Sequence, residues 1–411
     1  MTDTPTILVV GTFDTKDAEL TYLCERIAAA GGRVHKMDVS VLGDPAVPTD
    51  VSKHDVARAA GSSIEAAIAS DDENAAMQIM ARGAAARARG LQADGAIDGV
   101  IVLGGTMGTD LALDVCNALP LGVPKYVVST VAFSPLLPAE RLAPDIQMIL
   151  WAGGLYGLNS ICKSSLSQAA GAVVGAARTV EAPGGARPLV GMTSLGKTAL
   201  TYMVALKPAL EERGFEVAIF HATGMGGRAF EGLAAQGRFA CVFDFCTQEV
   251  GNHLFGSSVS AGSDRMTNAA RTGTPQIIAP GCYDLVDVIG WQPLGPEWRG
   301  NESHAHNRLL SSILLNTDQR RAVAREHGAK LAGAQSPSAL ILPAGGMGEW
   351  DRPGGPLHNA HGLAAFCAEM RRACPDHVAL HDIADHINDD GFAAQALDIF
   401  DAWRADGVVK A

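Results

Sequence analysis

The feature that most constrains the fold is a twofold series of short β-branched runs that alternate with longer alanine-rich segments. Such alternation is typical of repeated strand–helix–strand units around a parallel sheet that is covered on both faces. The first series predicts strands at Thr6–Val10, Arg33–Val39, Gly99–Leu103 and Lys125–Ser129. Helices are expected between them, including Lys16–Ala30 and Glu73–Arg89.

The second series begins after a linker. Closely spaced small residues predict a tightly packed helix at Ser160–Thr179, and EAPGGARP (Glu181–Pro188) has a linker composition. Beyond it, strands are expected at Leu189–Thr193, Phe215–His221, Phe239–Phe245, Gln276–Pro280 and Ala339–Pro343. A terminal helix follows Asp389. The predicted fold class is therefore α/β, with two Rossmann-like domains, residues 1–183 and 184–411, each a mainly parallel sheet flanked by helices.

Composition narrows the class of partner. The 411 residues are 47% hydrophobic, enough for well-packed cores, and the formal net charge of -12 disfavours nucleic acid and anionic membranes as partners. The N-terminus carries no export signal, and no run of 18 apolar residues occurs, so a cytoplasmic location is expected. The eight cysteines have neither zinc spacing nor the density of a disulfide scaffold, and reduced thiols without a metal are expected.

The first predicted strand runs into GTFDTK (Gly11–Lys16), directly before a helix. A glycine turn that leads into a helix places free backbone N–H groups and about half a positive charge where a phosphate binds. Thr12 and Thr15 add hydroxyl groups. Lys16 adds a cation, and Asp14 adds a hydrogen-bond acceptor or a magnesium partner. The alternative is that Asp14 or Thr15 only caps the helix.

A second glycine turn, GGTMGT (Gly104–Thr109), follows the strand that ends at Leu103 and again leads into a helical segment. Because the carboxyl ends of parallel strands meet at one edge of a sheet, the two loops are expected to face each other across a ligand crevice. Neither loop matches GxGxxG, which disfavours a dinucleotide cofactor. Asp38, at the end of the second strand, is placed to accept a ribose hydroxyl, unless it is a surface aspartate.

VVGTFDTKDAEL and VLGGTMGTDLA in the first half, and FHATGMGGRAFE in the second, resemble the family related to the N-terminal region of the tomato mosaic virus resistance protein, whose bacterial relatives are uncharacterised. The similarity extends to HNR near residue 306 and HINDDGF near residue 386, where relatives carry HNP-type and HINDP-type patterns. The resemblance implies two Rossmann-like domains, ATP with Mg²⁺ bound by the first, and self-association, but no reaction. The matched motifs nominate as cofactor-binding residues Gly11, Thr12, Asp14, Thr15, Lys16, Gly104, Gly105, Thr106 and Gly108.

A competing nucleotide motif opens the second domain. Gly191–Thr198 matches the P-loop expression GxxxxGK[ST], with Lys197 as its lysine, and Asp244 ends a strand of the kind that supplies a magnesium ligand. A true P-loop follows a complete strand, yet only Pro188, Leu189 and Val190 separate Gly191 from the linker. Gly191 is therefore expected inside the strand, and the P-loop NTPase is an alternative.

Further glycine turns suggest a second ligand cleft. GMGGR (Gly224–Arg228) and GGMG (Gly345–Gly348) follow predicted strands and are suited to a small anion or polar metabolite, or are tight turns only. The nominated substrate residues are His221, Thr223, Gly226, Arg228, Gly345 and Gly346. Among the histidines, His306 and His386, with Asn307, are the catalytic candidates because they lie in the segments that carry the resemblance.

Three functions fit these residues. The first is an ATP-dependent enzyme that acts on a small polar or anionic metabolite at the domain cleft. The second is an ATP-binding regulatory or interaction protein without turnover, and the third is a metabolic enzyme of the second domain in which ATP serves structure. Each is expected as a homo-oligomer, a dimer in the simplest case, with a nucleotide as a partner and, for the two enzymes, a small-molecule substrate as well.

Overall fold

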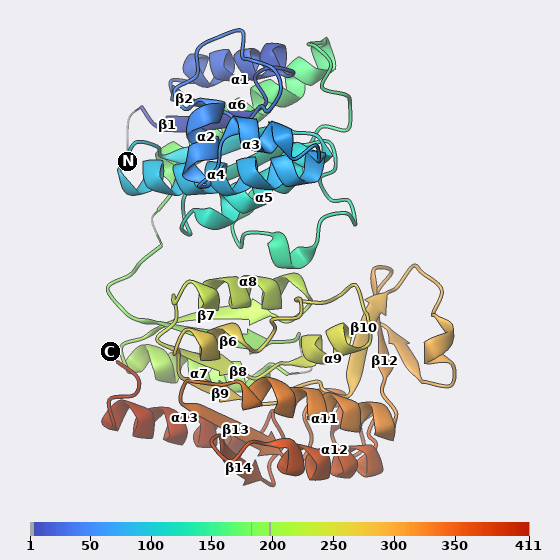
Figure 1. The fold of residues 1–411 in the computed structure, drawn as a ribbon. Coiled ribbons are helices and arrows are strands. Elements are labelled where there is room, and N and C mark those ends of the chain that lie inside the picture. The colour runs from blue at the N-terminus through green and yellow to red at the C-terminus, as the bar shows by residue number, and fades with distance from the viewer. Residues whose placement is uncertain (1–3, 182, 197–198, 411) are drawn as a thin grey trace. The chain divides into compact units, whose positions relative to one another are not determined.

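Two large parallel sheets, one in each half of the chain, organise the structure (Figure 1). The computed structural model describes residues 4–181, 183–196 and 199–410. The chain divides into two compact units, Met1–Pro183, here called unit 1, and Gly184–Ala411, here called unit 2. Both units are mainly parallel sheets flanked by helices, so the predicted pair of Rossmann-like α/β domains is confirmed.

Unit 1 contains a five-stranded sheet with the order β2-β1-β3-β4-β5, in which every neighbouring pair is parallel. Its strands are β1 (Thr6–Gly11), β2 (Arg33–Asp38), β3 (Gly99–Gly104), β4 (Lys125–Ser129) and β5 (Ile146–Leu150). Its helices are α1 (Asp17–Ala29), α2 (Lys53–Ala59), α3 (Ile64–Ala69), α4 (Glu73–Ala93), α5 (Thr106–Ala118) and α6 (Ser160–Thr179).

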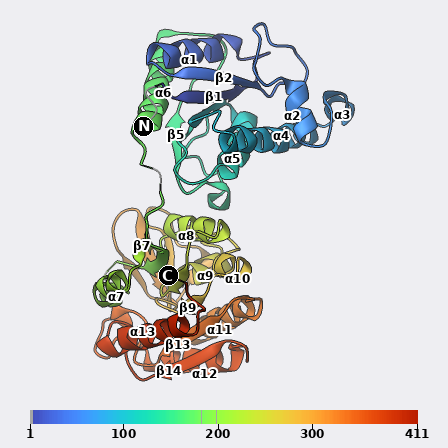
Figure 2. The same cartoon turned by 90° about the vertical axis from the view of Figure 1, so that its left-hand side faces the viewer.

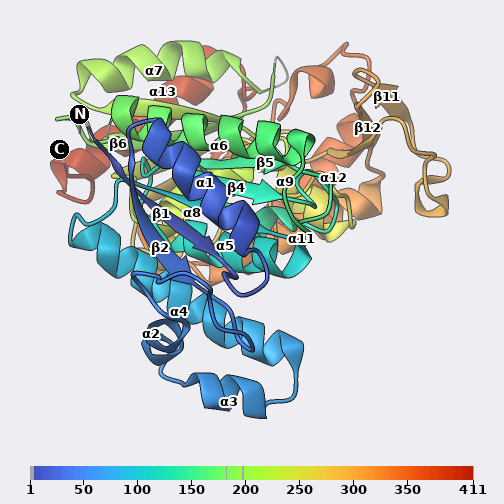
Figure 3. The same cartoon turned by 90° about the horizontal axis from the view of Figure 1, so that it is seen from above.

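Alternation along β1 explains the layers of unit 1. Ile7 and Val9 are buried against one face, which α1 and α6 cover, and these helices pack on each other (Figure 3). Leu8 and Val10 point to the opposite face, where α4 packs on α5 and α2 on α4 (Figure 2). Successive side chains of a strand point to opposite faces, and a strand with both faces covered is apolar throughout.

Unit 2 contains a six-stranded parallel sheet with the order β14-β13-β9-β8-β6-β7. Its strands are β6 (Leu189–Ser194), β7 (Glu216–His221), β8 (Cys241–Asp244), β9 (Gln276–Ile278), β13 (Ser338–Pro343) and β14 (Ala379–Ile383). Its helices are α7 (Thr201–Glu212), α8 (Met225–Ala235), α9 (Gln248–Leu254), α10 (Asn268–Arg271), α11 (Thr317–Ala332), α12 (Ala360–Ala373) and α13 (Asp390–Ala405).

An antiparallel sheet, which the sequence analysis did not predict, interrupts unit 2 between β9 and α11. It has the order β10-β12-β11 and consists of β10 (Leu285–Ile289), β11 (Ser303–Ala305) and β12 (Leu310–Leu314). β10 packs on α9, which follows β8 of the parallel sheet. The insertion therefore brings its residues to the edge of unit 2 at which β8 ends.

The two parallel sheets share one strand order. β1 lies between the second and third strands of unit 1, and β6 lies in the same way between β7 and β8 in unit 2. The chain thus leaves the first strand of each unit toward one side and returns on the other, which makes a topological switch point at β1/β3 and at β6/β8. None of the described helices is long and apolar enough to cross a membrane.

Candidate functional site

The loop after β1 is a turn that leads into an uncapped helix. The backbone N–H groups of Thr15 and Lys16 donate to Thr12 O at 3.2 and 2.9 Å, and Lys16 is the N-cap of α1. No side chain accepts a hydrogen bond at this cap, so neither Asp14 nor Thr15 caps the helix as the alternative required. The first N–H groups of α1 therefore remain open to an external acceptor.

The loop after β3 also leads into a helix without a side-chain cap. Gly105 is the N-cap of α5, again without a side-chain hydrogen bond, and Thr106 is the first residue of the helix. A Cβ atom on Gly104 would lie 2.5 Å from Gly108 Cα, so this glycine is needed where α5 crosses the strand end. A Cβ atom on Gly105 would meet nothing closer than Thr130 Oγ1 at 3.8 Å, and packing does not require this glycine.

Two carboxylates lie beside the first loop and keep one oxygen each without a partner. Asp38 is fully buried, and its Oδ1 accepts from Phe13 N at 3.2 Å and Ser40 N at 3.0 Å. Asp14 Oδ2 accepts from Gly43 N at 3.1 Å. Neither Asp38 Oδ2 nor Asp14 Oδ1 has a hydrogen-bond partner among the described residues, although both atoms are buried. The interpretation of Asp38 as a surface residue is therefore wrong.

The remaining polar groups of the first loop lie together. Thr12 Oγ1 and Thr15 Oγ1 are 3.0 Å apart, and Lys16 Nζ lies 5.2 Å from the ring centroid of Tyr156. Tyr156 belongs to the loop after β5 and is 94% exposed. No group of three or more His, Cys, Asp or Glu side chains in the described part of the chain is arranged to hold a metal ion. A magnesium ion here would take most of its ligands from phosphate and water.

The glycine loop after β7 in unit 2 already binds an anion of the same chain. Gly224 N and Gly227 N donate to Glu249 Oε1 at 2.6 and 3.1 Å, at the N-terminus of α8. A Cβ atom on Gly227 would lie 1.8 Å from Glu249 Oε2, and one on Gly226 would lie 1.7 Å from His221 O. The glycines of this loop are thus explained by close packing and by an internal carboxylate.

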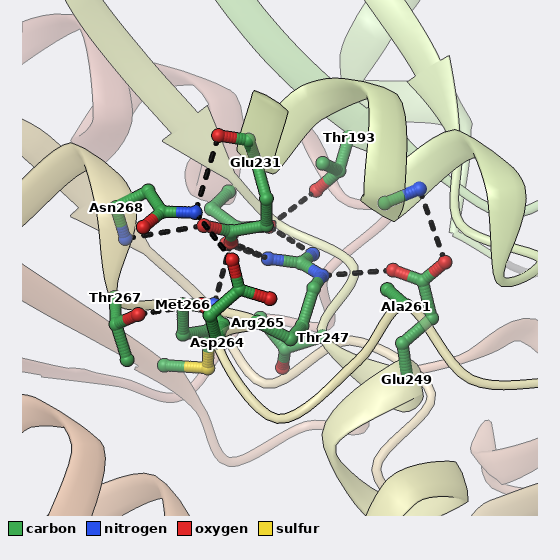
Figure 4. Close-up of polar contacts among 12 residues, drawn as sticks. Thr193, Glu231, Thr247, Glu249, Ala261, Asp264, Arg265, Met266, Thr267 and Asn268 are labelled. Atoms are coloured by element: carbon green, nitrogen blue, oxygen red, sulfur yellow. Dashed lines mark hydrogen bonds and ion pairs between the residues drawn. The ribbon is translucent and has the colours of Figure 1, made fainter. Parts of the chain in front are cut away.

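Arg265 is the centre of a buried ionic network at the β6/β8 switch point (Figure 4). Its guanidinium donates to both oxygens of Asp244 at 2.5 and 2.6 Å, and it also pairs with Glu249 at 2.8 Å and with Glu231 at 3.2 Å. Burial raises the pKa of Glu231 to about 7 against the opposing effect of Arg265. Burial also raises the pKa of Glu249.

The other nominated cleft residues of unit 2 have structural partners. Arg228 is buried and pairs with Asp264 at 2.5 Å. Gly346 has a φ of +128° and accepts from Ile387 N at 2.9 Å, and a Cβ atom on Gly345 would lie 2.6 Å from Ala384 O. His221 is exposed, and its Nδ1 accepts from Gly196 N at 3.4 Å. Thr223 lies in the turn between His221 and α8, where its N–H donates to His221 O at 2.8 Å.

Two of the catalytic candidates, His306 and His386, contact the same segment, Gly348–Trp350. His386 is buried, its Nε2 lies 3.0 Å from Gly348 O, and its Nδ1 accepts from Asn388 N at 3.0 Å. Burial lowers the pKa of His386, which favours the neutral form of the ring. His306 stacks on Trp350 with ring centroids 5.0 Å apart, and it is exposed. Asn307 Oδ1 accepts from Leu309 N at 2.7 Å and shapes the turn between β11 and β12.

The start of the P-loop motif does not have the geometry that a P-loop requires. Gly191 lies inside β6, paired with Ala218 and Val242, and therefore does not open a phosphate loop. Asp244, its candidate magnesium ligand, is bonded to Arg265 and accepts from Thr193 Oγ1 at 2.7 Å. Lys197 and Thr198 lie outside the described residues.

Comparisons with known proteins give the family but no activity. The N-terminal and C-terminal domain models of the uncharacterised protein family UPF0261 match residues 5–182 and 187–404. A UPF0261 protein of Brucella suis is 57% identical over 99% of this chain and 98% of its own length, and one of Clostridium tetani is 33% identical over 94% and 96%.

A plant protein and one solved structure are also similar. The ToMV resistance protein Tm-1(GCR237) of Solanum lycopersicum is 29% identical over 74% of this chain and 41% of its own length. The Streptomyces sp. SF2575 glycosyltransferase SsfS6, solved with thymidine diphosphate, is 14% identical with a TM-score of 0.20, covering 96% of this chain and 99% of that one, and so low a score tells nothing of function. On the two domain matches, this chain belongs to the UPF0261 family.

Proposed function

We propose that unit 1 binds ATP with Mg²⁺ at the edge where β1 and β3 end. The observation that carries the proposal is the pair of uncapped helix N-termini, at Lys16 and Gly105, which follow neighbouring strands at the switch point. Open N–H groups and the positive end of the helix dipole favour phosphate groups. ATP agrees with the nucleotide that the family resemblance implies.

The residues around these helices supply the remaining contacts. Lys16 adds a cation, and Thr12 and Thr15 add hydroxyl donors next to the open N–H groups. The unpartnered oxygens of Asp14 and Asp38 are acceptors for ribose hydroxyl groups or for the water shell of Mg²⁺. A buried acceptor without a partner costs about 1 to 3 kcal/mol, which a bound ligand would recover.

We extend the proposal to an ATP-dependent enzyme whose second substrate binds in unit 2. The support is that unit 2 repeats the switch point of unit 1 and contains buried polar atoms without a hydrogen-bond partner among the described residues, such as Asn268 Oδ1 and Ser336 Oγ. A non-catalytic ATP-binding protein is the competing function. Release of phosphate or of AMP from ATP in the presence of extracts of small metabolites separates the two.

Calorimetry of ATP binding, with and without Mg²⁺, tests the first step. Lys16→Ala is expected to weaken binding by about 1.5 to 3 kcal/mol, the usual contribution of a hydrogen bond to a charged group. Gly105→Ala is expected to weaken it at least tenfold, because its Cβ atom enters the space open to the phosphates.

Gly171→Ala in α6 is the matched control, because a Cβ atom there meets nothing within 4 Å. This variant should bind ATP as the parent does. Absence of ATP binding by the parent, or equal affinity in the parent and both site variants, would refute the site.

A further inference from the structure

Two buried aspartates of unit 2 share one arginine, outside the sites described so far. Asp284 lies directly before β10, Asp351 ends the short helix η3 (Glu349–Asp351), and Arg320 lies in the first turn of α11. These three residues, here called the Asp351 cluster, are at most 1% exposed. The cluster therefore joins three segments that are far apart in the chain: the start of the antiparallel insertion, the glycine loop after β13, and α11.

Arg320 cannot neutralise both carboxylates of the cluster. Its Nε donates to Leu315 O at 2.9 Å, and its Nη1 donates to Tyr283 Oη at 3.0 Å. Its Nη2 lies 3.8 Å from Asp284 Oδ2, and neither of these two atoms has a hydrogen-bond partner among the described residues. One guanidinium thus faces two acids, and a buried charge without a counter-ion is costly.

The two acids of the cluster hold protons more tightly than free aspartates do. Burial, the larger effect, and the neighbouring Asp284 carboxyl raise the pKa of Asp351 to about 8, against the opposing effects of Arg320 and of the Met347 and Asn359 backbones. Burial also raises the pKa of Asp284, and Arg320 opposes it. Two acids that interact in this way titrate as a pair, so a single shared proton balances the charge of the arginine.

The other titratable groups that face Asp351 in the described part of the chain supply no fixed positive charge. His358 Nδ1 donates to Asp351 O at 2.6 Å and lies 3.7 Å from Asp351 Oδ1, but an imidazole is charged only when it is protonated. Tyr283 and Cys367 are buried, and burial raises the pKa of both, so they stay neutral into the alkaline range. Arg352, the next residue along the chain, pairs outside the cluster. Loss of the shared proton therefore leaves a buried negative charge without a counter-ion.

The segment that ends in Asp351 also contacts the antiparallel insertion. The ring centroid of Trp350 lies 4.6 Å from that of His304 and 5.0 Å from that of His306. His304 belongs to β11, and His306 follows this strand. Because Trp350 is the residue next to Asp351, a movement of Asp351 out of the cluster would also take the indole away from the two imidazoles.

We propose that the Asp351 cluster is a proton-dependent latch, in which one proton shared by Asp284 and Asp351 holds η3 against the antiparallel insertion. At alkaline pH this proton passes to water, and two carboxylates then face the single guanidinium. Their repulsion releases η3 together with Trp350, and His304 and His306 lose the indole that packs on them. The latch lies within unit 2 and does not depend on nucleotide binding by unit 1.

Fluorine NMR of the full chain labelled with 5-fluorotryptophan tests the latch. The resonance of Trp350 is assigned by its absence in Trp350→Phe, and it is followed from about pH 7 to about pH 9.5. Most of this range lies above the usual histidine pKa of about 6.5. We expect the resonance to change in one step with a midpoint at about pH 8, because the indole leaves the two imidazole rings.

Two variants identify the titrating pair. Asp284→Asn and Asp351→Asn each remove one charge without changing the shape of the side chain, so the remaining carboxylate balances the guanidinium at every pH. Each variant should keep the Trp350 resonance of the closed form up to about pH 9.5. Circular dichroism reports whether each variant is folded, and one folded variant is enough to decide.

Asp382→Asn is the matched control, because Asp382 lies near Cys367, as Asp351 does, but pairs with Arg371 at the surface. This variant should keep the midpoint of the parent. The proposal is overturned if the Trp350 resonance of the parent does not change over this range. It is also overturned if the folded Asp284 and Asp351 variants keep the midpoint of the parent, or if the control loses the step.

Discussion

The two switch points share a strand order but differ in what lies at the strand ends. Unit 1 leaves helix N-termini open, whereas unit 2 fills the same place with its own charged side chains. In unit 1 the central strands end in glycines, Gly11 and Gly104, and two helices begin without a side-chain cap. In unit 2 the corresponding edge is filled by side chains: Thr193 of β6 is bonded to Asp244 of β8, and Arg265 is bonded to Asp244 and to Cys246 O. Topology therefore fixes where a ligand can bind, and the residues at the strand ends decide whether the place is open or already occupied.

Removing Arg265 should produce the largest effect, because it takes away the centre of the network that fills the switch point of unit 2. Arg265→Met leaves Asp244, Glu231 and Glu249 buried without their counter-ion, and we expect unit 2 to lose about 3 to 5 kcal/mol of stability. Calorimetric unfolding measures this, since two units can show separate transitions and ATP should raise the midpoint of the unit 1 transition alone.

Arg371 is the control for this prediction, because it pairs with Asp382 at the surface. Arg371→Ala should cost less than about 1 kcal/mol. If Arg265→Met were no less stable than Arg371→Ala, the network would contribute little to the stability of unit 2.

The pH dependence of unit 2 should show a smaller effect of the same network. The pKa of Glu231 rises from 4.5 in the unfolded chain to about 7 in the folded state, so the folded state holds this proton more tightly. The stabilisation is complete below pH 4.5 and is lost as the pH rises through 7, a difference of about 3 kcal/mol.

Glu231→Gln cannot titrate, so the stability of the parent relative to this variant should fall between pH 4.5 and 7.5. Urea unfolding at a series of pH values measures the difference. A parent and variant whose stabilities run parallel over this range would show that Glu231 is ionised throughout.

The smallest expected effect comes from one glycine-to-alanine substitution in each unit, which compares how tightly the two glycine loops are packed. Gly227→Ala forces a Cβ atom against the Glu249 carboxylate, and we expect unit 2 to lose about 1 to 3 kcal/mol. Gly105→Ala meets only Thr130 at 3.8 Å and should change the stability of unit 1 by less than about 0.5 kcal/mol. Urea unfolding of both variants checks this, and equal losses at the two positions would mean that the unit 1 loop is as tightly filled as the unit 2 loop.

The parallel sheets were predictable because their strands are apolar runs with both faces buried. The predicted strand Lys125–Ser129 and the helix Ser160–Thr179 coincide with β4 and α6. Strands with weaker patterns were missed: β5 and β14 are partly exposed edges, and β11 is fully exposed. Hydrophobic periodicity carries no signal for a short polar strand, whose pairing depends on distant residues.

The positions of the glycine loops followed from the sequence, but their partners did not. Glu249 and Arg265 are separated by 16 residues and look like surface charges in the chain, since a buried ion pair has no sequence pattern of its own. His386 was nominated for its motif, and its bonds to Gly348 and Asn388 could not be predicted from that motif.

The Glu249 carboxylate occupies the glycine loop after β7 and competes with any dissolved anion for its N–H groups. A carboxylate held by its own backbone acts at an effective concentration set by its tether, which does not fall when the protein is diluted. Free phosphate must displace the Glu249 carboxylate, which belongs to the same chain. The displaced carboxylate stays nearby, and its negative charge repels the phosphate. The loop is therefore insensitive to the anion content of its surroundings, whereas the open helix ends of unit 1 can respond to it.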